Sequence, residues 1–583
     1  MSSVRKAVVI AFLLLLVPAA FAQATGAIDF TSNLQRIDGF GAAIAFQRSN
    51  LMHGLTGLTP ENQARLMDLL FSQKRGIGLS IVRLGVGSSP TAEPYDSMHS
   101  IQPVDPGGPD APPQYVWNHD DDGQVWVSTQ ASLYGVRRFL ASPWSAPGYM
   151  KTNGTDKNGG SLCGLTGTTC ASGDWRQAYA NYLAQYLKFY QQEGLQITDF
   201  SLQNELNFTA TYASMRYTTG QAVEMIKILG PTIKAASPTT NIVCCEPAQW
   251  NSGPAYNSAI LADPVASSYT DIFAGHEYGS AARTPYAGGK TVWMTEWGLN
   301  GSTWNAAWDL NETQSRAFVL ANDIMDALRL GNINAYVYWV AGSLGATRAF
   351  VQIPNPGPDF VVSKRLYAMG AFSKFIRPNA YRVSANTTNS NVKITAFRNA
   401  SGSKVIEIIN NATTPIQGTY TLDAGSADAV PTTYVSDETH DIGEVGNATI
   451  SGTTLTVTLP RRSLTTIVLP PQNIEGTEQL AATTTLSKFG DGTYQATVKI
   501  TNKGTGTIEN VSLTSALLGA ATGTTLPESE LPQSLGSIAP GGYMTTSVTF
   551  PASAGPSGSA SVARFTGTYD GGTFSTGLRV MLP

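Results

Sequence analysis

The sequence predicts a (β/α)8 TIM barrel with a side β-domain, followed by a separate C-terminal β-sandwich. Three observations predict this architecture. Short apolar segments alternate with amphipathic helical stretches between residues 37 and 378, a pattern typical of parallel β/α units. Segments with period-two alternation of apolar and polar residues fill 379–470. After Pro470 and Pro471 a second strand-rich region covers 478–583, with turns rich in Gly, Ser and Thr.

The barrel is predicted from its eight candidate strands. They are 37–41, 79–85, 139–143, 197–203, 242–246, 272–276, 291–296 and 335–340. The clearest helical stretches between them are 62–71, 175–193, 220–235 and 312–330, the last opened by Glu312 after a capping Asn311. Eight β/α units in order indicate a closed barrel over 37–378.

The regions that flank the barrel have strand character. Residues 379–470 are expected to form a side β-domain packed beside the barrel, joined by an N-terminal strand from 23–36. A linker is expected at 471–477, before an immunoglobulin-like sandwich over 478–583. All ten Trp lie between Trp117 and Trp339, so the tail lacks the rings that sugar-binding modules use. We therefore expect the tail to be a spacer or attachment domain.

The first 22 residues resemble a secretory signal peptide. Arg5 and Lys6 precede an apolar run, and Ala20-Phe21-Ala22 supplies small residues for cleavage near Ala22. The alternative is a membrane anchor, but the apolar run is short for a bilayer span, and no later segment is apolar enough. The sequence therefore predicts a secreted protein without a membrane span.

Charge and cysteine content exclude several partners. The net charge is −4 and no run of Lys or Arg forms a nucleic-acid patch. Only five His are present, and neither they nor the cysteines have the spacing of a zinc site, so no metal and no cofactor are expected. Export permits disulfides, and Cys163 with Cys170 is the favoured pair. The adjacent Cys244 and Cys245 are either buried thiols or a vicinal bridge.

Two carboxylates carry the predicted chemistry. Glu205 follows the fourth strand and Glu296 ends the seventh, and both ends lie at the functional face of a barrel. Strands four and seven face each other across the barrel mouth, so the two acids can flank a bound sugar. Glycoside hydrolysis needs one protonated and one ionised carboxyl group. The alternative is that both Glu are salt-bridge partners at the starts of loops.

Neighbouring residues add to this interpretation. Asn204 directly precedes the first Glu, and its amide can bond a sugar 2-hydroxyl, a contact that strengthens in the transition state. Glu246 and Glu277 also end strands, but they lack the cross-barrel relation. Each is expected to be a sugar contact or a structural residue.

Several motifs resemble those of glycoside hydrolase family 30, a family with a TIM barrel fused to a side β-domain. The motifs are Ile37-Asp38-Gly39-Phe40-Gly41, residues 142–151 (SPWSAPGYMK), Gln203-Asn204-Glu205 and Trp293-Met294-Thr295-Glu296. Three further stretches are similar to its largely fungal xylanase branch: Val116-Trp117-Asn118, residues 173–181 (GDWRQAYAN) and Cys244-Cys245. The resemblance covers about residues 27–470 and implies retention, with Glu205 as acid/base and Glu296 as nucleophile. Leu206 departs from the family, which usually has Pro there.

Other site residues are expected at strand ends. Trp144 and Trp339 could stack on sugar rings or be core residues. Tyr278 is expected to hydrogen-bond Glu296, and Arg83 to support the same carboxylate.

Arg48 lies on the loop after the first strand. In the xylanase branch that this chain resembles, an arginine on this loop can read the carboxylate of a glucuronic acid branch, because its fork binds carboxylates bidentately. The alternative is a surface arginine without a ligand.

The resemblance implies a retaining endo-β-1,4-xylanase, either glucuronoxylan-directed or xylobiose-releasing, and we expect it to be a monomer. On the same fold, β-1,6-glucanase, β-1,6-galactanase and glucosylceramidase activities are alternatives. A non-catalytic polysaccharide-binding surface protein is the alternative of another class. Release of reducing sugar from a small polysaccharide panel separates these hypotheses.

Overall fold

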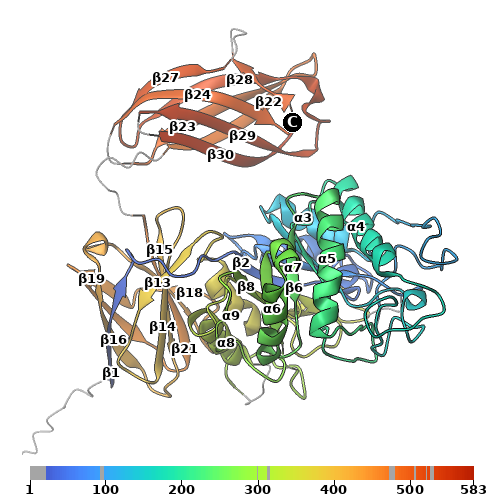
Figure 1. Cartoon of the computed structure of the whole chain (residues 1–583). Helices are drawn as coiled ribbons and strands as arrows, with labels where there is room; N and C mark the ends of the chain where they lie inside the picture. The colour runs from blue at the N-terminus through green and yellow to red at the C-terminus, as the bar shows by residue number, and fades with distance from the viewer. Residues whose placement is uncertain are drawn as a thin grey trace, which may run out of the picture. The chain divides into compact units, whose positions relative to one another are not determined.

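A computed structural model describes residues 22–91, 97–298, 300–310, 316–471, 480–504, 507–519, 521–525, 531–570 and 572–583. The chain divides into two compact units, Met1–Pro470 and Pro471–Pro583 (Figure 1). Three predicted features fall largely outside the described residues: the signal peptide before Ala22, the helix start at Glu312 and the linker 471–477.

Within the described residues of the first unit, eight parallel strands close into a barrel, and the barrel prediction is confirmed. The strands are β2 (Gly39–Ala43), β3 (Ile81–Val86), β4 (Arg138–Pro143), β5 (Asp199–Ser201), β6 (Asn241–Cys245), β7 (Ile272–His276), β8 (Thr291–Glu296) and β9 (Ala335–Tyr338). Pairing of β2 with β9 closes the ring. At Gly41 a Cβ would lie 2.4 Å from the Ile81 carbonyl oxygen, so glycine permits the close approach of β2 to β3.

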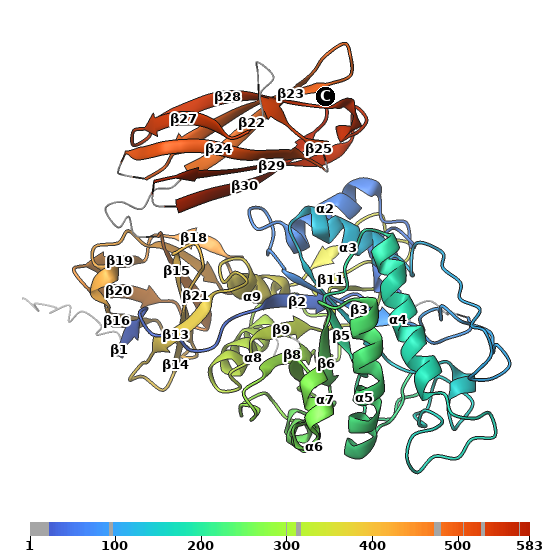
Figure 2. The same cartoon turned by 45° about the horizontal axis from the view of Figure 1, so that its top comes forward.

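Helices surround the barrel, and α4 and α5 lie side by side on its outside (Figure 2). The helices are α1 (Arg48–Met52), α2 (Pro60–Phe71), α3 (Gln124–Leu133), α4 (Arg176–Gln192), α5 (Thr219–Ala236), α6 (Gly253–Ala262), α7 (Pro264–Tyr269), α8 (Ala317–Arg329) and α9 (Lys364–Ser373). Side-chain caps fix the N-terminal ends of two helices, α2 and α5. Thr59 accepts from the Asn62 amide, and Thr218 forms a capping box with Gln221. None of the described helices is long and apolar enough to cross a membrane.

The side domain is a sheet that wraps around its own core. Its strands run in the order β18-β17-β21-β15-β14-β13-β1-β16-β20-β19. Their bounds are β1 (Ala22–Asp29), β13 (Tyr381–Ala385), β14 (Val392–Arg398), β15 (Lys404–Asn410), β16 (Ile416–Leu422), β17 (Thr432–Ser436), β18 (Gly443–Val445), β19 (Ala448–Ser451), β20 (Thr454–Leu459) and β21 (Ser463–Leu469). The N-terminal strand β1 pairs with β13 and β16, so it belongs to this sheet.

Strand β15 shows how the side domain joins the barrel. Ile406 and Ile408 face the side domain's core, whereas Val405 and Ile409 belong to the apolar cluster of the barrel. Every residue of β15 is buried as a result. A small sheet of β10 (Gly342–Ser343), β11 (Val351–Gln352) and β12 (Val361–Val362) lies in the loop after β9.

The second unit is a β-sandwich with its own core. One sheet has the order β22-β23-β28-β26, and the other has the order β25-β24-β29-β30 with β27 paired to β24. The strands are β22 (Leu480–Lys488), β23 (Tyr494–Asn502), β24 (Ile508–Leu518), β25 (Ala521–Thr522), β26 (Thr524–Thr525), β27 (Gln533–Ile538), β28 (Tyr543–Phe550), β29 (Ala560–Tyr569) and β30 (Gly572–Met581). The strand pairings are antiparallel, as expected for the predicted sandwich.

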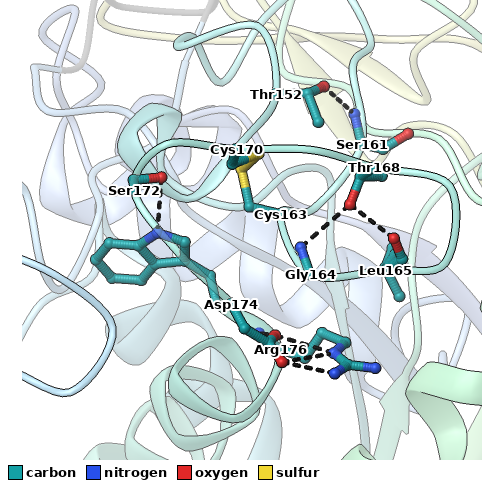
Figure 3. Close-up of a disulfide and its surroundings, with 11 residues drawn as sticks. Thr152, Ser161, Cys163, Gly164, Leu165, Thr168, Cys170, Ser172, Asp174 and Arg176 are labelled. Atoms are coloured by element: carbon teal, nitrogen blue, oxygen red, sulfur yellow. Dashed lines mark hydrogen bonds and ion pairs between the residues drawn. A yellow bond between two sulfur atoms is a disulfide. The ribbon is translucent and has the colours of Figure 1, made fainter.

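All four cysteines form disulfides. Cys163 pairs with Cys170, as predicted, and closes a loop between β4 and α4 (Figure 3). Inside this loop the Thr168 hydroxyl accepts from the Gly164 amide and donates to the Leu165 carbonyl oxygen. Cys244 and Cys245 form a vicinal disulfide at the end of β6. Of the two expected alternatives, the structure shows the disulfide and not the buried thiols.

Candidate active site

The C-terminal ends of the barrel strands enclose a pocket of about 340 Å³. Side chains from the loops after several different strands converge on it, which is where barrel enzymes place their chemistry. The lining residues are Phe46, Arg48, Trp144, Glu205, Phe208, Tyr212, Ala248, Gln249, Tyr278, Glu296, Trp339 and Arg348. Six of the eight predicted site residues line this pocket, and Asn204 and Arg83 lie behind it.

Both predicted carboxylates reach the pocket. Glu296 is the last residue of β8, and Glu205 lies four residues after the end of β5. One carboxylate oxygen of each lies within 4.8 Å of the other and of a His276 ring nitrogen. Glu205 has a φ of 44°, a left-handed conformation that is uncommon outside glycine, and its amide donates to the Glu246 carbonyl oxygen. Backbone strain of this kind concentrates at functional sites.

Glu296 is fixed through both of its oxygens. Arg83 Nη1 donates to Oε2 at 2.5 Å, and Tyr278 Oη donates to Oε1 at 2.9 Å. Both bonds were expected from the positions of these residues at strand ends. The carboxylate of Glu296 therefore has a fixed orientation at the pocket floor.

Glu205 has a different environment. It is 7% exposed, and burial raises its pKa, with the nearby charge of Glu296 acting in the same direction. The His276 ring opposes this shift, because its Nδ1 lies 3.2 Å from Glu205 Oε1. The two acids thus have contrasting partners, which is the arrangement that separates an acid from a nucleophile.

Arg83 supports the site from beneath the pocket. It is fully buried and reaches Glu296, Asn204 and Glu246, so it supports the Glu296 carboxylate without lining the pocket. Asn204 Oδ1 accepts from Arg83 Nη2 at 2.7 Å, so the group of Asn204 that could donate to a sugar hydroxyl is its Nδ2. Arg83 is a support under the site, since its guanidinium ties β3 to the ends of β5, β6 and β8.

Aromatic rings form one wall of the pocket. Trp144 and Trp339 have ring centroids 5.9 Å apart, and Phe46 packs edge-on against both. Tyr212 stands edge-on to Phe46. Both tryptophans line the pocket, as expected of residues that stack on a sugar. Both are also almost fully buried, as expected of core residues, so each has both of the properties that were posed as alternatives.

Two arginines reach the pocket from different loops. Arg48, at the start of α1, donates to the Phe46 carbonyl oxygen, and its guanidinium carbon lies 5.7 Å from the centroid of the Trp339 ring. Arg348, in the loop after β9, donates to the Gly298 carbonyl oxygen. The pocket therefore combines two acids with two guanidinium groups at its rim.

Sequence reasoning missed several lining residues. Phe208 and Tyr212 follow Glu205 in the same loop, and Phe208 is 42% exposed at the pocket. His276 ends a predicted strand, a position that could have marked it as a site residue. Of the two uncertain acids, Glu246 is fully buried beneath the pocket, and Glu277 turns away to Arg283 and the Ala282 amide.

Within the described part of the chain, Glu205, His276 and Glu296 are the group whose ligand atoms lie close enough to hold a metal ion. The partners already described account for this proximity. Glu296 is bonded by Arg83 and Tyr278, and His276 lies between two carboxylates. We assign no metal or cofactor to the pocket.

A closed (β/α)8 barrel with two facing carboxylates at the ends of its fourth and seventh strands has the architecture of a barrel glycosidase. Residues 37–292 match the glycosyl hydrolase family 30 TIM-barrel domain, and residues 379–467 match the family 30 beta sandwich domain. The chain belongs to glycosyl hydrolase family 30.

Relatives in this family have different named activities. A solved structure, the catalytic domain of the GH30 xylanase C from Talaromyces cellulolyticus, is 35% identical with a TM-score of 0.70, covering 76% of this chain and 99% of that one. The glucuronoxylanase XynC of Bacillus subtilis is 28% identical over 59% of this chain and 77% of its own. The endo-1,6-beta-D-glucanase neg1 of Aspergillus fumigatus is 25% identical over 68% of this chain and 83% of its own.

Proposed function

We propose that the protein is a retaining β-glycosidase that hydrolyses xylan, with Glu296 as nucleophile and Glu205 as acid/base. The observation that carries the retaining mechanism is that one carboxylate oxygen of Glu205 lies within 4.8 Å of one carboxylate oxygen of Glu296. Retaining enzymes hold their carboxyl groups about 5–5.5 Å apart, whereas inverting enzymes leave about 6.5–9.5 Å for a water.

The chemistry follows from the two environments. Glu296 attacks the anomeric carbon while Glu205 gives its proton to the leaving glycosidic oxygen, and a covalent glycosyl-enzyme forms. Glu205 then takes a proton from water, whose oxygen displaces Glu296 from the anomeric carbon. Arg83 and Tyr278 hold the nucleophile in place for both steps. Burial raises the pKa of Glu205, which favours the protonated form that the first step needs.

The xylan assignment rests on the relatives and on the chemistry of the rim. Two of the similar proteins are named as a xylanase and a glucuronoxylanase. We propose that Arg48 contacts the carboxylate of a glucuronate branch, because it lines the pocket beside Trp339 and presents a fork suited to carboxylates.

We further propose that the protein is exported. Residues 1–22 have the features of a signal peptide, and two disulfides suit an oxidising compartment.

A substrate panel tests this function. Release of reducing sugar is measured from glucuronoxylan, arabinoxylan, β-1,6-glucan and β-1,6-galactan, with a Glu296→Ala variant as the control for contaminating activity. We expect the fastest release from a xylan and none from the variant. Faster release from β-1,6-glucan would move the assignment to the activity named for the Aspergillus fumigatus relative.

A further inference from the structure

His276 lies beneath the pocket between two carboxylates. It is the last residue of β7 and is fully buried. Its Nδ1 is 3.2 Å from Glu205 Oε1, and its Nε2 is 3.6 Å from Glu246 Oε1. Among the described residues, neither that Nε2 nor that Oε1 has a hydrogen-bond partner. The Nε2 has its ion-pair contact with this Oε1, and the Oε1 also lies 3.4 Å from Arg83 Nη2.

Glu246 is built to remain charged. Its Oε2 accepts hydrogen bonds from the hydroxyls of Ser142 and Ser201, and Arg83 Nη2 lies 3.4 Å from its Oε1. Burial alone would raise the pKa of Glu246, but Arg83 and His276 outweigh burial and hold that pKa well below its usual range. A permanent anion therefore lies at the far side of the His276 ring.

The charged groups that act on His276 most strongly, among the described residues, belong to the site itself. Glu296 supplies negative charge, and Glu205 and Glu246 offer carboxyl oxygens to the ring nitrogens. Arg83 supplies positive charge, and the Tyr278 ring stands edge-on at 6.3 Å. Burial alone would lower the pKa of His276. The carboxylates reverse this effect and raise it to about 9.

We propose that Glu246 holds His276 as an imidazolium, and that His276 is a positioning residue that fixes the acid proton of Glu205. The Nδ1–H of His276 donates a hydrogen bond to Oε1 of Glu205. The proton that Glu205 gives to the glycosidic oxygen is therefore carried on its Oε2. When that proton leaves, the new carboxylate gains the adjacent imidazolium as its partner. This inference rests on the proposed acid/base role of Glu205.

The first test is the alkaline limb of the pH profile of kcat/KM, which reports the acid. The His276→Gln substitution removes the imidazolium, which should raise the pKa of Glu205 and move the alkaline limb to higher pH by about one pH unit. Activity on xylan should fall about tenfold or more, whereas activity on a dinitrophenyl glycoside, which needs no acid, should change by less than about threefold. His440→Gln, at a half-exposed position of the side domain outside the pocket lining, is the matched control.

The Glu246→Gln substitution distinguishes two routes by which Glu246 could affect the pKa of Glu205, because they shift the alkaline limb in opposite directions. If Glu246 acts on Glu205 directly through space, removing its negative charge must lower the pKa of Glu205 and move the limb downward. If it acts through His276, the imidazolium is lost and the limb must move upward. The same change made in the His276→Gln background should then cause no further upward shift. A downward or absent shift in Glu246→Gln overturns the proposal.

A measurement on the wild-type chain keeps the proposal testable if these variants fail to fold. Nitrogen-15 NMR of labelled histidine, with each of the other four histidines replaced in turn for assignment, should show His276 as an imidazolium at pH 8. A neutral ring at pH 7 overturns the proposal, whatever the activity. Absence of glycosidase activity with a charged His276 would instead overturn the proposed function.

Discussion

At the residue scale, the site is organised by how each acid is surrounded. Glu296 receives two hydrogen bonds from groups fixed on β3 and after β7, whereas Glu205 lies in a buried position beside an imidazole. Neither acid could exchange roles with the other without exchanging these neighbours. Replacing each acid should therefore produce a different chemical defect.

Replacing Glu296 with Ala should abolish turnover of xylan and allow slow rescue by azide. Azide occupies the space of the lost carboxylate and attacks the anomeric carbon from that side, which gives an α-glycosyl azide. Product analysis by NMR checks this outcome. Hydrolysis of xylan at the wild-type rate by the purified variant would show that Glu296 is not the nucleophile.

Replacing Glu205 with Ala should spare substrates that do not need an acid. Activity on xylan should be lost, while formation of the glycosyl-enzyme from a dinitrophenyl glycoside should continue, because that leaving group departs without protonation. Burst kinetics measures the two steps separately. An equal loss of the first step on both substrates would argue against the acid role.

Arg48→Ala tests the substrate branch. Loss of a charge-assisted bidentate contact should lower kcat/KM on glucuronoxylan about ten- to a hundredfold, or about 1.5–3 kcal/mol, and leave undecorated xylan nearly unchanged. Arg48→Lys should restore only part of the loss, because an ammonium lacks the fork. Equal losses on both xylans would show that Arg48 supports its loop against Phe46 and Trp339 instead.

At the element scale, strand β15 joins the side domain to the barrel with both faces buried. This double burial joins the two matched family domains of this chain into one packed unit. We expect deletion of 381–470 to expose the apolar surface of the barrel and cause misfolding. A soluble, cooperative barrel without those residues, observed by calorimetry, would contradict this.

Glu407 on β15 gives a pH prediction. It is fully buried, its Oε2 accepts from the Thr466 hydroxyl, and burial raises its pKa well above the usual range. The folded state thus favours the neutral acid of Glu407, while the unfolded chain ionises this side chain near its ordinary pKa of about 4.3. Between the two pKa values, each pH unit lowers stability by about 1.4 kcal/mol.

The Glu407→Gln substitution removes the loss of stability that ionisation of Glu407 causes as the pH rises. The variant should gain thermal stability relative to wild type, with a larger gain at pH 8 than at pH 5, measured as Tm. Glu444→Gln, on an exposed position of β18, is the matched control and should show no such trend. A gain that is independent of pH would mean that Glu407 is ionised in the folded protein.

The elements that sequence could predict share a physical signature. The barrel strands are short apolar runs that end in chemistry-bearing residues, and α2, α4, α5 and α8 segregate apolar from polar residues. Helix α3 buries Gln124 and Ser128 together with Val125 and Val127, so its apolar residues mark no single face. The contacts of His276 with Glu205 and Glu246 depend on how far these side chains extend inside the barrel. The positions of strand ends in the sequence do not predict this.

At the scale of the whole molecule, the chain consists of a two-domain catalytic unit and an independent sandwich. The tail has its own apolar core, and the described residues that line the pocket all belong to the first unit. The family match ends at residue 467. The chemistry is therefore assigned to the first unit.

Deleting 478–583 should leave kcat/KM on soluble xylan within about twofold of the full chain, as expected for domains that fold independently. Steady-state kinetics on the truncated protein checks this. A loss of more than about tenfold in a protein with an unchanged melting temperature would show that the sandwich contributes to the site.

The most direct test of the central claim is proton NMR of the first product. If Glu205 and Glu296 carry out a double displacement, the anomeric proton of the initially released sugar from a β-xylan must be that of the β-anomer, with the α-anomer appearing only later by mutarotation. Initial release of the α-anomer would contradict the account.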